Sequence, residues 1–77
     1  MPPKTSPTRI DGTALAVIRQ KDGHTQASLA AACGYSNSYI GDLENGYRHG
    51  NPTVLKRLST ALNVPPYMLL ARRADAA

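Results

Sequence analysis

The stretch TQASLAAACGYSNSYIGDLENG, residues 25–46, decides the fold of this chain. Thr25 stands where a helix cap is favoured, and the residues after it predict a short helix over 26–33. Gly34 follows at the position where a left-handed residue closes a helix, a conformation that glycine adopts without steric cost. A second helix, over 37–45, comes next and is preceded by a serine cap. The stretch therefore predicts two short helices joined by a tight glycine turn.

Apolar residues at helical spacing give each of these helices one inward face. The second helix is polar on its other side, and that side is left for solvent or a partner. The inward residues of the two helices are Leu29, Ala30, Cys33, Ile40 and Leu43.

Further helices are predicted on both sides of this stretch. Asp11 is the expected cap of a helix that runs to about Lys21. Asn51 caps a fourth helix that opens with Pro52, since the missing N–H of a proline costs nothing at the first helical position. Pro66 opens a fifth helix. The inward stripe of the first helix is Ala14, Leu15, Val17 and Ile18, and that of the fourth is Leu55, Leu58, Ala61 and Leu62.

The 77 residues divide into one small domain and two terminal segments. Residues 1–10 are rich in proline and lack an apolar period, so they predict a disordered basic arm. Residues 11–71 hold the helices, and residues 72–77 predict a flexible tail. A chain of this size buries only about 60% of its unfolded surface, which leaves little room for a deep substrate cleft.

Basic residues outnumber acidic ones by nine to five and give a net charge of +4. This excess favours a polyanionic partner, either nucleic acid or an acidic membrane surface, although the charge alone also fits ordinary solubility. The single Cys33 cannot form an internal disulfide, which suits a reducing cytoplasm. No apolar run approaches the roughly 20 residues that span a bilayer, so we expect a cytoplasmic protein.

The two short helices have the arrangement of a helix-turn-helix, which places its second helix in the major groove of DNA. Several residues around them occur in an order that is typical of one family. They are Arg19, Thr25, Gln26, Leu29, Ala30, Gly34, Ile40, Leu43, Glu44, Asn45, Gly46, Leu58, Ala61, Leu62 and Val64. Through these residues the chain resembles the lambda Cro/cI-type (XRE-like) helix-turn-helix family of phage and bacterial repressors, over about residues 12–71.

The resemblance implies an all-α, compact bundle of about five helices of the lambda repressor type. It also implies a DNA-binding transcriptional regulator, a repressor that binds a pseudo-palindromic operator. Two copies would bind with their recognition helices about 34 Å apart, one turn of B-DNA. The free protein could be a monomer that dimerises only on DNA. Candidate dimer surfaces are Tyr67, Met68, Leu69, Leu70 and the loop after Gly46.

Four residues of the second short helix are expected to face the base pairs. Asn37 and Ser38 lie where members of the family read base edges; asparagine can pair with adenine through two hydrogen bonds, whereas serine is less selective. Asp42, one turn beyond Ser38, could accept from cytosine N4, repel phosphate or stay in solvent. Gly41 would let the helix backbone approach the groove floor, or it only relieves crowding within the fold.

Residues near the helix ends are expected along the sugar-phosphate backbone. Gln26 opens its helix where a side-chain amide and the helix N-terminus can hold one phosphate. Thr25 either is a cap alone or also contacts a phosphate. Lys4 and Arg9 could enter a minor groove or belong to a tail without function. The expected backbone contacts are Thr25, Gln26, Ser36, Tyr39, Asn45, Tyr47 and Arg48, among which Arg48 displaces counterions through its charge.

The family pattern pairs Arg19 with Glu44 in a partly buried salt bridge between the first and third helices. This pair would be structural and would orient the recognition helix without reading sequence. Removing one partner leaves the other charge buried and should cost about 3–5 kcal/mol.

Catalytic and metal-binding roles are not favoured. Cys33, His24 and His49 have no metal-ligand spacing, and Cys33 falls on an apolar helix face, where a small core residue is expected. The serines show no partnership with a histidine and a carboxylate, and no glycine-rich phosphate loop is present. We therefore expect neither an enzyme nor a metal, cofactor or small-molecule site.

Two other functions are kept as alternatives. An antitoxin-like interaction module that neutralises a partner protein would need an apolar docking segment outside the core, and residues 67–77 are the only candidate. Binding to a membrane surface is disfavoured, because the basic residues are spread over arm, loop and tail and do not gather on one helix face.

Overall fold

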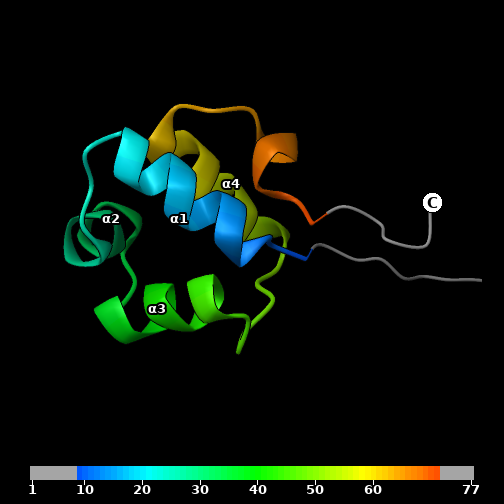
Figure 1. Cartoon of the computed structure of the whole chain (residues 1–77), viewed down its shortest axis with the longest axis horizontal. Coiled ribbons are helices and arrows are strands. Elements are labelled where there is room, and N and C mark those ends of the chain that lie inside the picture. Colours follow the sequence, from blue (N-terminus) through cyan, green and yellow to red (C-terminus); the bar gives the residue numbers. More distant parts are fainter. Residues whose placement is uncertain (1–8, 72–77) are drawn as a thin grey trace, which may run out of the picture.

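Four α-helices and one short 3₁₀ helix make up the computed structural model of the protein, which describes residues 9–71. In Figure 1, α1 crosses in front of α4, α2 lies at one side, and α3 lies apart along the lower edge. The described residues contain no strand beyond one isolated bridge, so the all-α prediction is confirmed. None of the helices in this part of the chain has the length and apolarity needed to cross a membrane. The elements are α1 (Gly12–Lys21), α2 (Gln26–Cys33), α3 (Asn37–Asn45), α4 (Pro52–Leu62) and the 3₁₀ helix η1 (Pro66–Leu69).

Each α-helix begins at the cap that the sequence predicts. The Asp11 carboxylate accepts from two backbone N–H groups of α1. Thr25 and Ser28 form a reciprocal capping box at α2, in which each side-chain oxygen accepts from the other residue's N–H, at 3.0 and 2.9 Å. The Asn51 side chain accepts from the Val54 N–H at 2.9 Å. Such caps each stabilise a helix by about 1 kcal/mol, and together they fix where α1, α2 and α4 start.

The turn between α2 and α3 depends on Gly34, whose φ of +79° is left-handed. Gly46 ends α3 in the same way with a φ of +84°. Both positions were predicted from glycine alone, and residues with a side chain would be strained there. Gly34 therefore sets the end of α2, and Gly46 sets the end of α3.

The core is built from aliphatic side chains, with at least one from every helix. Its largest members are completely buried, and α2 packs against both α3 and α4. The fully buried large side chains are Leu15, Leu29, Ile40, Leu43, Leu58 and Leu69.

The predicted stripe of α1 is wrong at Val17, which is 50% exposed. In a helix of 3.6 residues per turn, Val17 lies about 200° around the axis from the buried Leu15. Ile18 keeps its place against the core and is half-buried. The inward face of α1 is completed by Arg19, a charged residue that is buried.

The expected fifth α-helix is a four-residue 3₁₀ helix in which only Leu69 is buried. The chain leaves the helix at Leu70, which turns extended and forms an antiparallel bridge with Ile10. On either side of the bridge, Asp11 N–H donates to Leu69 O and Ala71 N–H donates to Arg9 O, both at 2.8 Å. Leu69 O and Ala71 N–H thus pair with the start of the domain and cannot extend a helix.

The bridge also shifts the boundary of the predicted arm. Ile10 was placed in the arm, yet it is 4% exposed and joins the core, because the bridge holds it against the rest of the domain. Residues 1–8, which include Lys4, and residues 72–77 lie outside the described residues. The described domain therefore starts at residue 9.

Gly12, the first residue of α1, sets how closely α1 approaches α3. A Cβ added at Gly12 would overlap the carbonyl oxygens of Leu43 and Glu44, near the C-terminal end of α3. These are backbone atoms and cannot be moved without moving α3. The absence of a side chain at Gly12 thus lets the start of α1 touch α3 directly.

Candidate nucleic-acid interface

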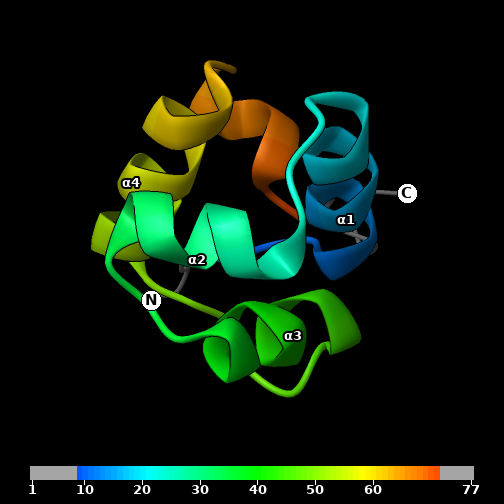
Figure 2. The same ribbon diagram turned by 90° about the vertical axis from the view of Figure 1, so that its left-hand side faces the viewer.

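One face of α3 is held by the fold, and the other is free. Ile40 and Leu43 on the inner face are completely buried. Figure 2 shows α3 at the edge of the molecule, with α2 passing above it. Asn37, Ser38 and Asn45 are exposed on the other side of the helix, so this side can meet a ligand without any rearrangement of the core.

Asn37 and Ser38 are exposed at the start of α3, as a base-reading role requires. Within residues 9–71 neither side chain makes a hydrogen bond, so their donors and acceptors are free for a ligand. Ser36, just before them, is exposed as well, and its hydroxyl accepts from the Tyr39 N–H at 3.0 Å as the cap of α3. A capping hydroxyl keeps its own proton to donate.

Asp42 lies further along the same face and is paired within the protein. Arg48 Nε donates to its carboxylate at 3.4 Å, and the Arg48 and Asp42 side chains are 60% and 40% exposed. The backbone supports the pair, because Asp42 O accepts from the N–H groups of Tyr47 and Arg48. The loop after α3 is thereby folded back along the helix, and Arg48 is brought over the ring of Tyr39 at 5.5 Å.

Gln26 and Gly41 lie against each other where α2 crosses α3. Gln26 Nε2 donates to Glu44 Oε1 at 2.9 Å, so the side chain lies across α3. A Cβ built on Gly41 would be 3.7 Å from Gln26 Oε1, an ordinary contact distance. Crowding in the free protein therefore does not demand glycine at this position.

Arg19 and Glu44 form the least exposed ion pair of the described residues. Arg19 Nε donates to Glu44 Oε2 at 2.5 Å and Arg19 Nη2 donates to Glu44 Oε1 at 3.3 Å, while the side chains are only 10% and 7% exposed. Arg19 Nη1 also donates to His24 O at 2.8 Å. With Gln26 on the same carboxylate, this network ties α1, α2 and α3 together on the side of α3 that faces the domain.

The other expected backbone contacts lie at the ends of the helices. Thr25 is exposed, with its hydroxyl oxygen engaged as the cap of α2. Asn45 and Tyr47 are exposed at the end of α3 and just after it, and Tyr47 is 79% accessible. Arg9 is exposed beside Ala71, at the end of the domain where η1 lies.

Two residues near α3 were not predicted from the sequence, Tyr35 and Arg57. The rings of Tyr35 and Tyr39 are 5.0 Å apart between centroids, and the Arg57 guanidinium lies 5.5 Å from the Tyr35 ring centre. With Arg48 over Tyr39, the order is arginine, ring, ring, arginine, and we call these four residues the aromatic–arginine strip. The spacing of the tyrosines, one helical turn, could have signalled their contact. Arg57 carries no such signal, because it comes from α4.

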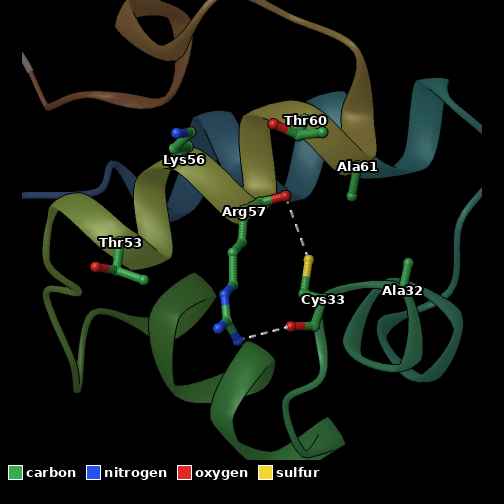
Figure 3. Close-up of a pocket in the computed structure, with 7 residues that line it drawn as sticks. All are labelled: Ala32, Cys33, Thr53, Lys56, Arg57, Thr60 and Ala61. Carbon is green, nitrogen blue, oxygen red and sulfur yellow. Dashed lines mark hydrogen bonds between the residues drawn. The ribbon is translucent and has the colours of Figure 1, made fainter.

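Arg57 and Cys33 make a reciprocal contact between α4 and the end of α2. Arg57 Nη1 donates to Cys33 O at 3.4 Å, and Cys33 Sγ donates to Arg57 O at 3.7 Å, as Figure 3 shows. Burial raises the pKa of the Cys33 thiol, and the nearby charge of Arg57 offsets part of that rise. A buried, protonated thiol is a poor nucleophile. No group of three metal-ligating side chains occurs in the described part of the chain.

The chain is similar in sequence to a helix-turn-helix family and to a repressor. A family profile described as "Helix-turn-helix" matches residues 15–69. A competence pilus inhibition repressor from Acinetobacter baylyi is 38% identical over 66 residues, 83% of this chain, and the chain spans only 60% of the length of that relative.

Solved structures resemble the domain over most of its length. The restriction-modification controller protein C.AhdI from Aeromonas hydrophila has a TM-score of 0.74 and 34% identity, covering 77% of this chain and 89% of its own. The P22 c2 repressor, solved in complex with a synthetic operator, has a TM-score of 0.72 and 33% identity, covering 80% and 96% of the two chains.

Proposed function

The chain belongs to the Cro/cI-type (XRE-like) helix-turn-helix family, and from this premise we propose that it regulates transcription by binding a specific double-stranded DNA sequence through α3. The observation that carries the proposal is the division of α3 into a fixed inner face and a free polar outer face. An α-helix with its side chains is about 10–12 Å across, close to the width of the major groove. The similarity to a repressor bound to its operator supports the same mode.

Base reading in this proposal belongs to the outer face of α3. Asn37 and Ser38 supply free donors and acceptors at the helix start, the part that a recognition helix presents first to the base edges. Asp42 would accept from cytosine N4, for which its carboxylate has to leave Arg48 or share it. Gly41 would contribute by its small size, which lets the helix backbone approach the groove floor. On the side toward α2, Gly41 is covered by Gln26.

Backbone contacts would come from the elements that flank α3. Gln26 at the start of α2 offers one amide proton beyond its bond to Glu44, together with the N–H groups of the helix end. Arg48 supplies charge at the other side. Contacts of this kind position the protein on DNA but carry no sequence information. The proposed set is Thr25, Gln26, Ser36, Tyr39, Asn45, Tyr47 and Arg48, with Arg9 and Lys4 as arm contacts.

We propose that two copies bind a pseudo-palindromic site, as the family resemblance implies. The exposed apolar residues of η1 and its end, Tyr67, Met68 and Leu70, supply the surface for the second copy. Leu69 does not, because it is completely buried in the core. The patch is small, so the copies are expected to associate on DNA and to sediment as monomers without it.

Selection of bound duplexes from a random library at near-physiological salt tests the proposal. An enriched inverted repeat is expected, and the spacing of its half-sites reports the geometry of the dimer. A folded protein that enriches no motif would overturn the proposal and favour a protein partner, as in the antitoxin-like alternative. Asn37→Ala should reduce binding to the enriched sequence, with Gln20→Ala, a change at an exposed position of α1, as the control.

A further inference from the structure

We propose that Arg57, on α4, is a further DNA-backbone contact, and that the aromatic–arginine strip holds one strand beside the start of α3. This inference rests on the proposed function and adds a residue to the same interface. It concerns α4, an element that otherwise supports the core and supplies none of the contacts proposed above. The ligand is the phosphate group of a duplex, whatever its base sequence.

Arg57 reaches from α4 to the start of α3. Its side chain crosses from α4 to the turn between α2 and α3, as Figure 3 shows, and Nη1 lies 3.8 Å from where a Cβ of Gly34 would be. The guanidinium also stacks on Tyr35, the residue just before the cap of α3. Arg57 therefore presents its charge at the start of the recognition helix, although its backbone belongs to a different layer of the domain.

The chemistry of Arg57 suits a phosphate. A guanidinium has five N–H donors, and within residues 9–71 only one of them is used, in a long bond of 3.4 Å to Cys33 O. Stacking on a ring leaves the donors at the edge of the guanidinium free and limits the rotamers of the side chain. Less entropy is then lost when the donors bind an anion.

The charges around Arg57 leave it more available to bind a phosphate than Arg48, which lies at the other end of the strip. Arg48 is partly neutralised by Asp42 at 3.4 Å, whereas among the described residues no carboxylate forms an ion pair with Arg57. Beside Arg57 an open groove of ≈ 650 Å³ runs between α2 and α4. Its lining contains a second cation and two hydroxyl groups and no acidic residue: Ala32, Cys33, Thr53, Lys56, Arg57, Thr60 and Ala61.

The rival explanation makes Arg57 purely structural, since its bond to Cys33 O also caps the end of α2. The two roles differ in their dependence on salt. A residue that neutralises a phosphate releases counterions, so its loss flattens the plot of log affinity against log salt concentration. A residue that only positions the turn leaves that slope unchanged.

The test compares Arg57→Gln and Arg57→Lys with Lys21→Gln in the whole chain. Lys21 is an exposed residue at the end of α1 away from α3, so its variant loses the same charge without touching the strip. Affinity is measured by fluorescence anisotropy on a mixed-sequence duplex and on the enriched duplex, across a salt series. For Arg57→Gln we expect weaker binding to both duplexes and a slope reduced by about 0.9, with Arg57→Lys and Lys21→Gln close to wild type.

A slope for Arg57→Gln equal to that of Lys21→Gln would overturn the inference, whatever the affinity. Phosphate ethylation interference gives a second readout, in which Arg57→Gln should lose sensitivity at one phosphate that wild type requires. Thermal unfolding of each variant identifies misfolding, and if Arg57→Gln is misfolded, Arg57→Met replaces it under the same criterion, because methionine also removes the charge and keeps an apolar stem beside Tyr35. Failure of the proposed function looks different, since wild type would then show no preference for any sequence while its salt slope could still be compared.

Discussion

Helix α3 carries two arginine–carboxylate pairs whose acidic residues lie only two positions apart. Arg19 and Glu44 meet at 2.5 Å with side chains 10% and 7% exposed, whereas Arg48 and Asp42 meet at 3.4 Å with side chains 60% and 40% exposed. Two residues along a helix turn a side chain by about 200°, so Glu44 faces the domain and Asp42 faces outward. One arginine–carboxylate pair thus holds the helix to the domain. The other, made of the same chemical groups, is exposed enough for its members to exchange partners.

Loss of the buried pair should have the largest effect. Glu44→Gln leaves Arg19 buried without its counter-charge and should lower the free energy of unfolding by about 3–5 kcal/mol. That is a large fraction of the roughly 5–15 kcal/mol that stabilises an ordinary domain. Denaturant unfolding measures it, with Asp42→Asn as the matched variant on the same helix. Equal losses for the two variants would break the distinction between the faces.

Asn37→Ala probes the outer face without touching either pair. We expect a loss of about 1–3 kcal/mol in binding to the enriched duplex, because the side chain is free to pair with a base. Binding to a mixed-sequence duplex and the unfolding free energy should stay at the wild-type values. A variant that weakens binding to both duplexes alike would assign Asn37 to the backbone.

Gly41→Ala separates folding from recognition at a single position. A methyl group fits beside Gln26, and alanine is a better helix former than glycine, so the variant should gain about 1 kcal/mol of stability. If the helix backbone approaches the groove floor, binding to the enriched duplex falls while thermal stability rises. Unchanged binding in the stabilised variant would show that Gly41 has no part in recognition.

The exposed pair should show the smallest coupling. A double-mutant cycle of Arg48→Ala and Asp42→Ala on unfolding should give about 0.2–1 kcal/mol, falling as salt screens the charges. The same variants should separate in DNA binding, because Arg48→Ala loses a phosphate contact and weakens binding to every duplex, whereas Asp42→Ala loses the proposed base contact and weakens binding mainly to the enriched duplex. A coupling of several kcal/mol that persists in high salt would place this pair in the same class as Arg19 and Glu44.

Local signals in the sequence predicted nearly all of the helix boundaries. Asp11, Thr25 and Asn51 act on backbone groups within three residues, and Gly34 acts on its own φ, so no knowledge of the fold is needed to place them. The error at Val17 came from the choice of stripe, because the run of apolar residues in α1 is wider than the face that the core accepts.

The parts of the interface that the sequence did not predict depend on contacts between distant segments. Arg57 meets Tyr35 only because α4 packs beside α2, and Gln26 meets Glu44 only because α2 crosses α3. Asp42 and Arg48 are close in sequence, but their pairing requires the loop to fold back after Gly46. The assignment of individual residues to bases and phosphates stays a prediction until a complex with DNA is measured.

The bridge between Ile10 and Leu70 brings the two ends of the described domain together, so the same fold could be built with the helices in a different order along the chain. Residues 9 and 71 are already joined through a backbone hydrogen bond of 2.8 Å, so a short linker could close the domain into a ring. The ring could then be opened at Gly23, in the exposed turn between α1 and α2. Such a circular permutant would begin with α2 and α3 and end with α1. Opening the chain at Gly23 leaves α2, the turn and α3 on one uninterrupted segment.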